Sequence, residues 1–139
     1  MHTEHLTNVK TYWVVSGWFI SVAVASAVLL FMEGIGLLGR SEGLDAVWIS
    51  VGVGLGFGAG GFFAGFRTAA APILHGGAIA GTSFVVWFLS NIVLGGVTTG
   101  VSAWEPLTIR AAALALLVQG GAAMIGCWLG YRYAPVRVE

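Results

Sequence analysis

The sequence predicts an all-α integral membrane protein with four transmembrane helices. Of its 139 residues, 58% are apolar and 9% are charged, whereas soluble domains average about 45–50% and about 25%. Four apolar runs each supply the roughly 20 residues that a helix needs to cross a bilayer. Six Lys and Arg balance six Asp and Glu, so no basic surface is expected for nucleic acid. The expected partners are membrane lipid, other transmembrane subunits or a second copy of the chain.

The chain divides into a cytoplasmic N-terminal tail, residues 1–11, and one transmembrane domain, residues 12–139, which ends in a short cytoplasmic C-terminal tail. The four spans are predicted at residues 12–38, 47–66, 72–94 and 106–131. The small residues at 23–27 resemble a leader-peptide cleavage site, but the apolar run continues beyond them. That run is too long for a cleaved leader, so we expect a retained helix.

Residues typical of helix ends flank these spans. Pro72 and Pro106 stand where helices should begin, a position at which the missing N–H costs nothing. Pro135 blocks continuation of the last span, and Ser41 and Asp45 are candidate N-caps of the second. Aromatic residues suited to the lipid headgroup level lie near predicted span ends at Tyr12, Trp13, Trp48, Trp104, Tyr131 and Tyr133.

The basic residues predict the orientation, because cytoplasmic loops carry the excess of Lys and Arg. On the side of the N-terminus lie Lys10, Arg67, Arg132 and Arg137. Arg40 and Arg110 lie on the other side. We therefore expect both termini in the cytoplasm, with the protein in the bacterial cytoplasmic membrane.

A short internal repeat relates the ends of the second and fourth spans. Residues 61–67 read Gly-Phe-Phe-Ala-Gly-Phe-Arg and residues 126–132 read Gly-Cys-Trp-Leu-Gly-Tyr-Arg. Shifted by 65 residues, two glycines, two aromatic positions and the arginine coincide. This pattern predicts two tandem helical hairpins related as parallel repeats. Convergence is the alternative, since close packing and an aromatic-arginine end suit any such helix.

Glycine is abundant, and 22 residues are of this type. In lipid, small residues let helices approach closely. One stripe of the second span contains Gly52, Gly56 and Gly60, and another contains Gly54, Gly58, Gly61 and Gly65. The two stripes lie about 200° apart at about 100° per residue, so this span should sit between two helices. Gly77 with Gly81, and Gly126 with Gly130, predict one close contact each in the third and fourth spans.

Ionisable and amide side chains within a bilayer are candidate functional groups. Glu33 should lie near the outer edge of the hydrocarbon core, at the interface. Alternatively it turns inward to meet Arg110 and Asn91 in an ion pair or an ion-coupling site. Gln119 falls near the middle of the fourth span, where we expect a hydrogen bond to a neighbouring helix.

His75 lies about one turn into the third span and is expected to make an interfacial hydrogen bond. With Ala71 before it and two glycines after it, His75 resembles the AxxxH setting of bacterial light-harvesting helices. That resemblance implies a chlorophyll-type pigment as the alternative. The single cysteine, Cys127, is expected to be a small buried hydrophobe, and no metal site is predicted.

Residues 60–77 contain Gly-Gly-Phe-Phe-Ala-Gly-Phe-Arg, a short connection and Ile-Leu-His-Gly-Gly. This stretch resembles the second-to-third helix hairpin of small, uncharacterised bacterial four-helix membrane proteins. The resemblance implies the fold but no particular activity. The chain is also similar in size to small multidrug transporters. It has Val-Ala-Ser at residues 24–26, in the middle of the first span, where those transporters carry an essential carboxylate.

The sequence favours a non-enzymatic accessory or assembly subunit of a larger cytoplasmic-membrane complex, for example a respiratory or photosynthetic one. No motif joins its scattered Ser, His and acidic residues into a catalytic site. The alternative is a small oligomeric transporter or channel that uses Glu33, Asn91, Arg110 or Gln119. A pigment-binding subunit acting through His75 is a further alternative.

Overall fold

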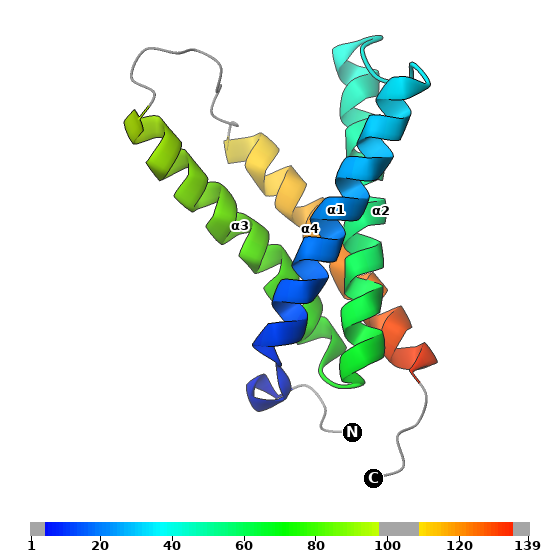
Figure 1. Ribbon diagram of the computed structural model, residues 1–139, viewed down its shortest axis with the longest axis vertical. Helices are drawn as coiled ribbons and strands as arrows, with labels where there is room; N and C mark the ends of the chain where they lie inside the picture. The colour runs from blue at the N-terminus through cyan, green and yellow to red at the C-terminus, as the bar shows by residue number, and fades with distance from the viewer. Residues whose placement is uncertain (1–4, 98–108, 135–139) are drawn as a thin grey trace.

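The computed structural model describes residues 5–97 and 109–134, and this part of the chain is helical with no strands. A short 3-10 helix, η1 (Leu6–Asn8), precedes four long helices (Figure 1). These are α1 (Thr11–Gly34), α2 (Glu42–Thr68), α3 (Pro72–Val97) and α4 (Ile109–Tyr133). All four are long and apolar enough to cross a membrane. The predicted all-α fold with four transmembrane helices is confirmed.

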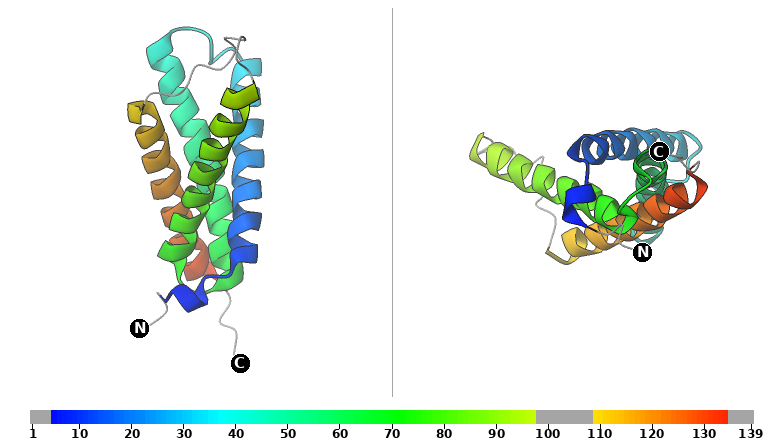
Figure 2. Two further views of the ribbon diagram at one scale, coloured as in Figure 1. Left: turned by 90° about the vertical axis from the view of Figure 1, so that its left-hand side faces the viewer. Right: turned by 90° about the horizontal axis from the view of Figure 1, so that it is seen from below.

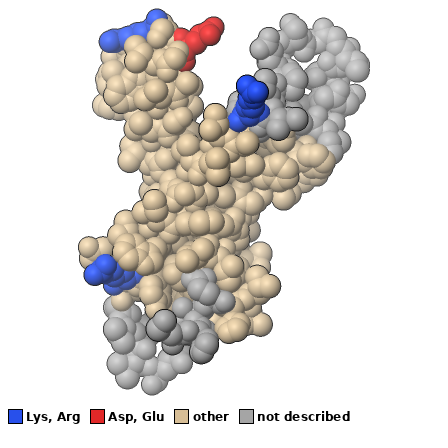
Figure 3. Space-filling model, turned by 180° about the vertical axis from the view of Figure 1, so that it is seen from behind, with Lys and Arg blue, Asp and Glu red and all other residues tan. Residues whose placement is uncertain are grey.

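The helices alternate in direction, so the chain enters α1 and leaves α4 at the same end of the molecule, here called the terminal end (Figure 1). The opposite end is called the far end. α1 and α2 run close together, whereas α3 inclines away from α1 toward the far end (Figures 1 and 2). Charged side chains lie toward the two ends of the face in Figure 3, with an uncharged belt between them. That distribution suits a molecule whose middle lies in hydrocarbon.

The first helix ends at Gly34, so the prediction that it reaches residue 38 is wrong. Gly36 (φ 71°) and Gly39 (φ 82°) adopt left-handed conformations, which glycine accepts without steric cost. The Arg40 Nε–H donates to the Gly36 carbonyl at 2.7 Å. A turn stabilised by this hydrogen bond therefore stands where the sequence predicts the last turn of the helix.

The second helix begins at Glu42, earlier than the predicted residue 47, because Ser41 caps it. The Ser41 hydroxyl accepts from the Leu44 N–H at 3.4 Å. Asp45 is not the N-cap, because it lies inside the first turn and its carboxylate accepts the Gly39 N–H at 3.0 and 3.1 Å. The two candidate caps thus have different roles: one starts the helix and the other holds the preceding loop.

The last two helices match their predicted spans closely. α3 starts at Pro72, as predicted, and continues to Val97. α4 runs from Ile109 to Tyr133, against a predicted 106–131. Ala69 (φ 47°) and Ala71 (φ 42°) form the left-handed connection that leads into α3. The predictions for Trp104, Pro106, Pro135 and Arg137 concern positions outside the described residues.

The first glycine stripe of α2 faces α1. A Cβ added to Gly56 would lie 2.5 Å from the Ala25 Cβ and 2.6 Å from the Ser21 carbonyl oxygen. A Cβ on Gly52 would lie 2.7 Å from a Leu29 methyl carbon, and one on Gly60 would overlap Ser21. Because backbone atoms of α1 occupy the space beside Gly56 and Gly60, the α1–α2 backbones pack directly against each other there.

The second stripe faces α4. A Cβ on Gly61 would overlap the Ala123 carbonyl, and one on Gly65 would overlap the Cys127 carbonyl. From the other side, added Cβ atoms on Gly126 and Gly130 would overlap the carbonyls of Gly58 and Phe62. Toward the far end the fit loosens, since a Cβ on Gly54 would lie 3.9 Å from a Val118 methyl carbon. The two stripes of α2 thus face different helices.

These contacts between α2 and α4, here called the seam, are reciprocal. Gly61 meets Ala123 while Gly126 meets Gly58, and the 65-residue shift converts one pair into the other. The same shift converts the contact of Gly65 with Cys127 into that of Gly130 with Phe62. Parallel helices with matching glycines can pack through the same surface on each side. Whether the hairpins arose by duplication stays a prediction.

The close contact of α3 lies one residue away from the predicted position. A Cβ on Gly76 would lie 2.5 Å from the Met124 Cα, whereas one on Gly77 would meet only the end of that side chain, at 3.3 Å. Gly81 has nothing within 4 Å. Among the described residues no backbone approaches Gly77 or Gly81 closely, because α4 crosses α3 on the side of Gly76. The close contact expected at this pair stays a prediction.

The close packing of the seam predicts that a Gly→Ala substitution there destabilises the fold more than the same substitution at an open position. Gly65→Ala should lower the free energy of unfolding by about 1–3 kcal/mol, as overpacking typically does, because the Cys127 backbone occupies the space. Gly121→Ala is the matched control, since Gly121 has nothing within 4 Å. Unfolding in mixed detergent micelles, followed by circular dichroism, measures both. Equal stability of the two variants would contradict the proposed role of the seam.

Candidate functional site: an uncovered face of α3

One side of α3 carries two glycines and two aromatic rings, and most of this side is left uncovered by the helices described here. Gly77, Gly81, Phe84 and Phe88 follow one another at intervals of four, three and four residues, so they share one side of the helix. We call these four residues the docking face. The Phe84 and Phe88 side chains are 44% and 51% exposed, and their rings stack with centroids 6.3 Å apart.

The neighbours of α3 explain why the docking face is open. α1 is joined to α3 by the Trp18 Nε1–H, which donates to the Ser83 hydroxyl at 2.8 Å. α4 packs against Gly76 and lies near Ala80, whose Cβ would be 3.6 Å from a Cβ on Gly120. Toward the far end α3 diverges from α1 (Figures 1 and 2). Gly81, Phe84 and Phe88 are turned away from these contacts, whereas Gly77 lies beside the end of the Met124 side chain.

His75 is fully buried and links the start of α3 to the start of α1. The Lys10 backbone N–H donates to its Nε2 at 3.1 Å. Nε2 must therefore be the unprotonated nitrogen, and Nδ1 carries the proton that is donated to the Ala71 carbonyl at 2.9 Å. Both ring nitrogens therefore have a backbone partner, and the predicted hydrogen bond of His75 is present. A pigment magnesium would have to displace the Lys10 N–H.

Gln119 lies on the seam side of α4, because it precedes Gly126 by seven residues, or two turns. Its Oε1 is buried and has no hydrogen-bond partner among the described residues. The expected bond from Gln119 to a neighbouring helix is therefore not found in this part of the chain. The physical reason lies in α2, which presents glycines such as Gly54 along the seam and thus no side-chain donor.

The proposed polar cluster at the far end is not assembled among the described side chains. Glu33 is exposed in the last turn of α1, and Arg110 is exposed near the start of α4. No hydrogen bond or ion pair joins these two side chains. Asn91 lies within α3, but its side chain is outside the described residues, so its part in the cluster stays a prediction.

The fold and these surfaces define an integral membrane protein with four transmembrane helices. Comparison with protein-family models, curated proteins and solved structures finds no match. The resemblance of residues 60–77 to small bacterial four-helix membrane proteins accordingly stays a prediction.

Removal of the His75 ring tests its role as a link between helices. His75→Leu should leave the Lys10 N–H without an acceptor and cost about 1–3 kcal/mol of stability. Hydrogen exchange at the Lys10 amide should accelerate, as mass spectrometry of the N-terminal peptides would show. Ser83→Ala, which removes the hydrogen bond from Trp18 of α1 to α3, is the control and should leave this amide protected. Unchanged exchange in His75→Leu would rule out the link.

Proposed function

We propose that this protein is a non-enzymatic accessory or assembly subunit of a larger complex in a bacterial cytoplasmic membrane. The observation that carries the proposal is the docking face, which pairs a GxxxG sequence with two exposed aromatic rings. Several glycines, Gly76 on α3 among them, meet neighbouring backbones closely, whereas Gly81 on the docking face has nothing within 4 Å. A transmembrane segment of another subunit, or of a second copy, fits this face.

The depth of Gly81 supports this reading. It lies nine residues after Pro72, the first residue of α3, which is about 14 Å along the helix at 1.5 Å per residue. That is close to the middle of a hydrocarbon core about 30 Å thick. Helices associate there through van der Waals packing and close approach at small residues, because lipid offers little hydrophobic drive. Phe84 and Phe88 would add contact area beside the glycine.

The charges support an orientation with both termini in the cytoplasm. Lys10, Arg67 and Arg132 belong to the terminal end, and Arg40 and Arg110 belong to the far end. The excess of basic residues at the terminal end agrees with the rule that cytoplasmic loops are the more basic.

A bulky residue on the docking face should abolish the association. Gly81→Leu is expected to lose the partner found with the wild-type chain after purification from native membranes in mild detergent, at unchanged stability. Quantitative mass spectrometry of the purified material measures the loss and also detects a second copy. Gly121→Leu, on another helix but equally free of neighbours, should retain the partner. A wild-type chain that purifies alone as a monomer would defeat the proposal.

A small oligomeric transporter is the second candidate, and the buried Gln119 Oε1 without a described partner favours it. An unsatisfied acceptor at membrane depth is costly, and a transported molecule could supply the donor. Flux of a candidate substrate into reconstituted vesicles should then fall at least about tenfold in Gln119→Ala, the factor for about 1.4 kcal/mol. Glu33→Gln tests the exposed carboxylate. Unchanged flux in both variants would exclude these residues as working parts.

A further inference from the structure

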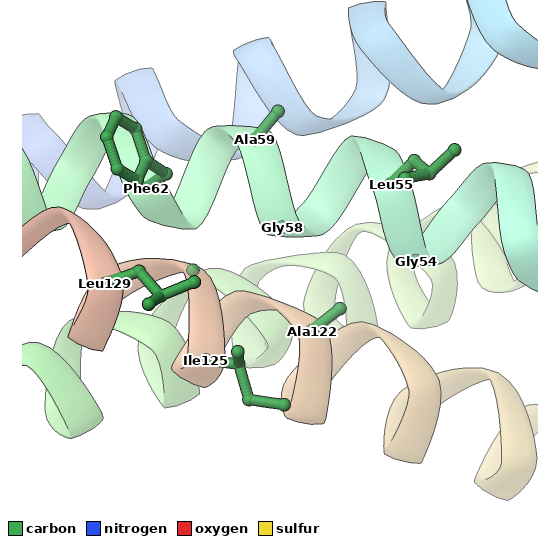
Figure 4. Close-up of a pocket in the computed structure, with 9 residues that line it drawn as sticks. Gly54, Leu55, Gly58, Ala59, Phe62, Ala122, Ile125 and Leu129 are labelled. Carbon is green, nitrogen blue, oxygen red and sulfur yellow. The ribbon is translucent and has the colours of Figure 1, made fainter.

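A long apolar groove follows the seam on the surface of the molecule. Its volume is about 360 Å³, and Figure 4 shows residues of α2 and α4 along its two sides. The nine lining residues are all apolar: Gly54, Leu55, Gly58, Ala59, Phe62, Ala122, Ile125, Gly126 and Leu129. The small glycine and alanine residues leave the space of the groove open, and the larger leucine, isoleucine and phenylalanine side chains border it. The groove suits a slender apolar occupant.

The groove is directed toward the terminal end and a positive charge. On α4, Ile125 and Leu129 lie on the same side of the helix as Arg132, which follows Ile125 by seven residues, or two turns. On α2, Phe62 continues toward Phe66 through a stacked ring pair with centroids 6.1 Å apart. Arg132 is in the last turn of α4, and hence at the expected level of the lipid headgroups.

The Arg132 guanidinium makes a cation–π contact with an aromatic ring instead of an ion pair with a described carboxylate. It lies 5.6 Å from the centroid of the Trp128 ring, and no hydrogen bond or ion pair joins it to another described residue. A cation–π contact with a ring leaves the N–H donors of a guanidinium unpaired. Its N–H groups at the edge are then available to a phosphate, which arginine binds through paired hydrogen bonds.

We propose that this groove binds one acyl chain of an anionic phospholipid and that Arg132 binds the phosphate of the same molecule. The apolar lining matches the chain, and the basic side chain at the terminal end matches the headgroup. Basic groups beside transmembrane helices attract anionic lipids of the cytoplasmic leaflet. The site is separate from the docking face, because the groove is formed by α2 and α4 and the docking face belongs to α3.

Native mass spectrometry of the purified full chain tests the headgroup contact. With phosphatidylglycerol and phosphatidylcholine of identical acyl chains, the wild type should retain the anionic lipid about fivefold better, the contribution of one basic side chain. Arg132→Gln should remove this preference. Arg67→Gln makes the same change of charge, but Arg67 lies 5.5 Å from the Trp13 ring of α1, away from the groove, and should keep the preference.

A second variant tests the acyl chain. Ala59→Phe fills the groove from an exposed position of α2 and should lower the retention of both lipids, with the helical content unchanged by circular dichroism. Equal retention of the two lipids by the wild type would overturn the proposal, as would equal effects of Arg132→Gln and Arg67→Gln. Normal lipid retention by Ala59→Phe would also overturn the proposal. The same holds if this variant alters only the oligomeric state and leaves lipid binding unchanged.

Discussion

The structure depends on direct contact between helix backbones through the glycines of α2. In lipid, burying apolar side chains against each other offers little gain over contact with acyl chains, so association relies on close packing. Gly56 and Gly60 supply that contact toward α1, and Gly61 and Gly65 supply it toward α4. With α2 held on two sides in this way, the remaining helix, α3, packs chiefly on α4, where Gly76 meets Met124.

The two hairpins use similar segments differently. Arg67 lies over the Phe63 ring at 5.9 Å, and Arg132 lies over the Trp128 ring at 5.6 Å, so both helices end with an arginine on an aromatic ring four residues earlier. Gly56, however, packs tightly on α1, while Gly121, its counterpart at the 65-residue shift, has nothing within 4 Å. The likeness of the two segments is thus local, and α4 stays open at a position where α2 is covered by α1.

Much of this arrangement follows from sequence patterns, and the rest depends on how the helices pack. Apolar run lengths predict all four helices, and the glycine spacing of α2 identifies the two sides that α1 and α4 occupy. The pattern cannot distinguish Gly76 from Gly77 as the contact of α3, because one residue turns the helix by about 100° and only the position of α4 selects between them. The acceptor for the Lys10 N–H is likewise unpredictable, since it lies 65 residues away.

That separation has a consequence for how the protein is made. The backbone donor just before α1 is satisfied by a ring that emerges from the ribosome only after α2 and the start of α3. The final packing of the first helix therefore requires the third, because this amide gains its acceptor only when the starts of α1 and α3 meet.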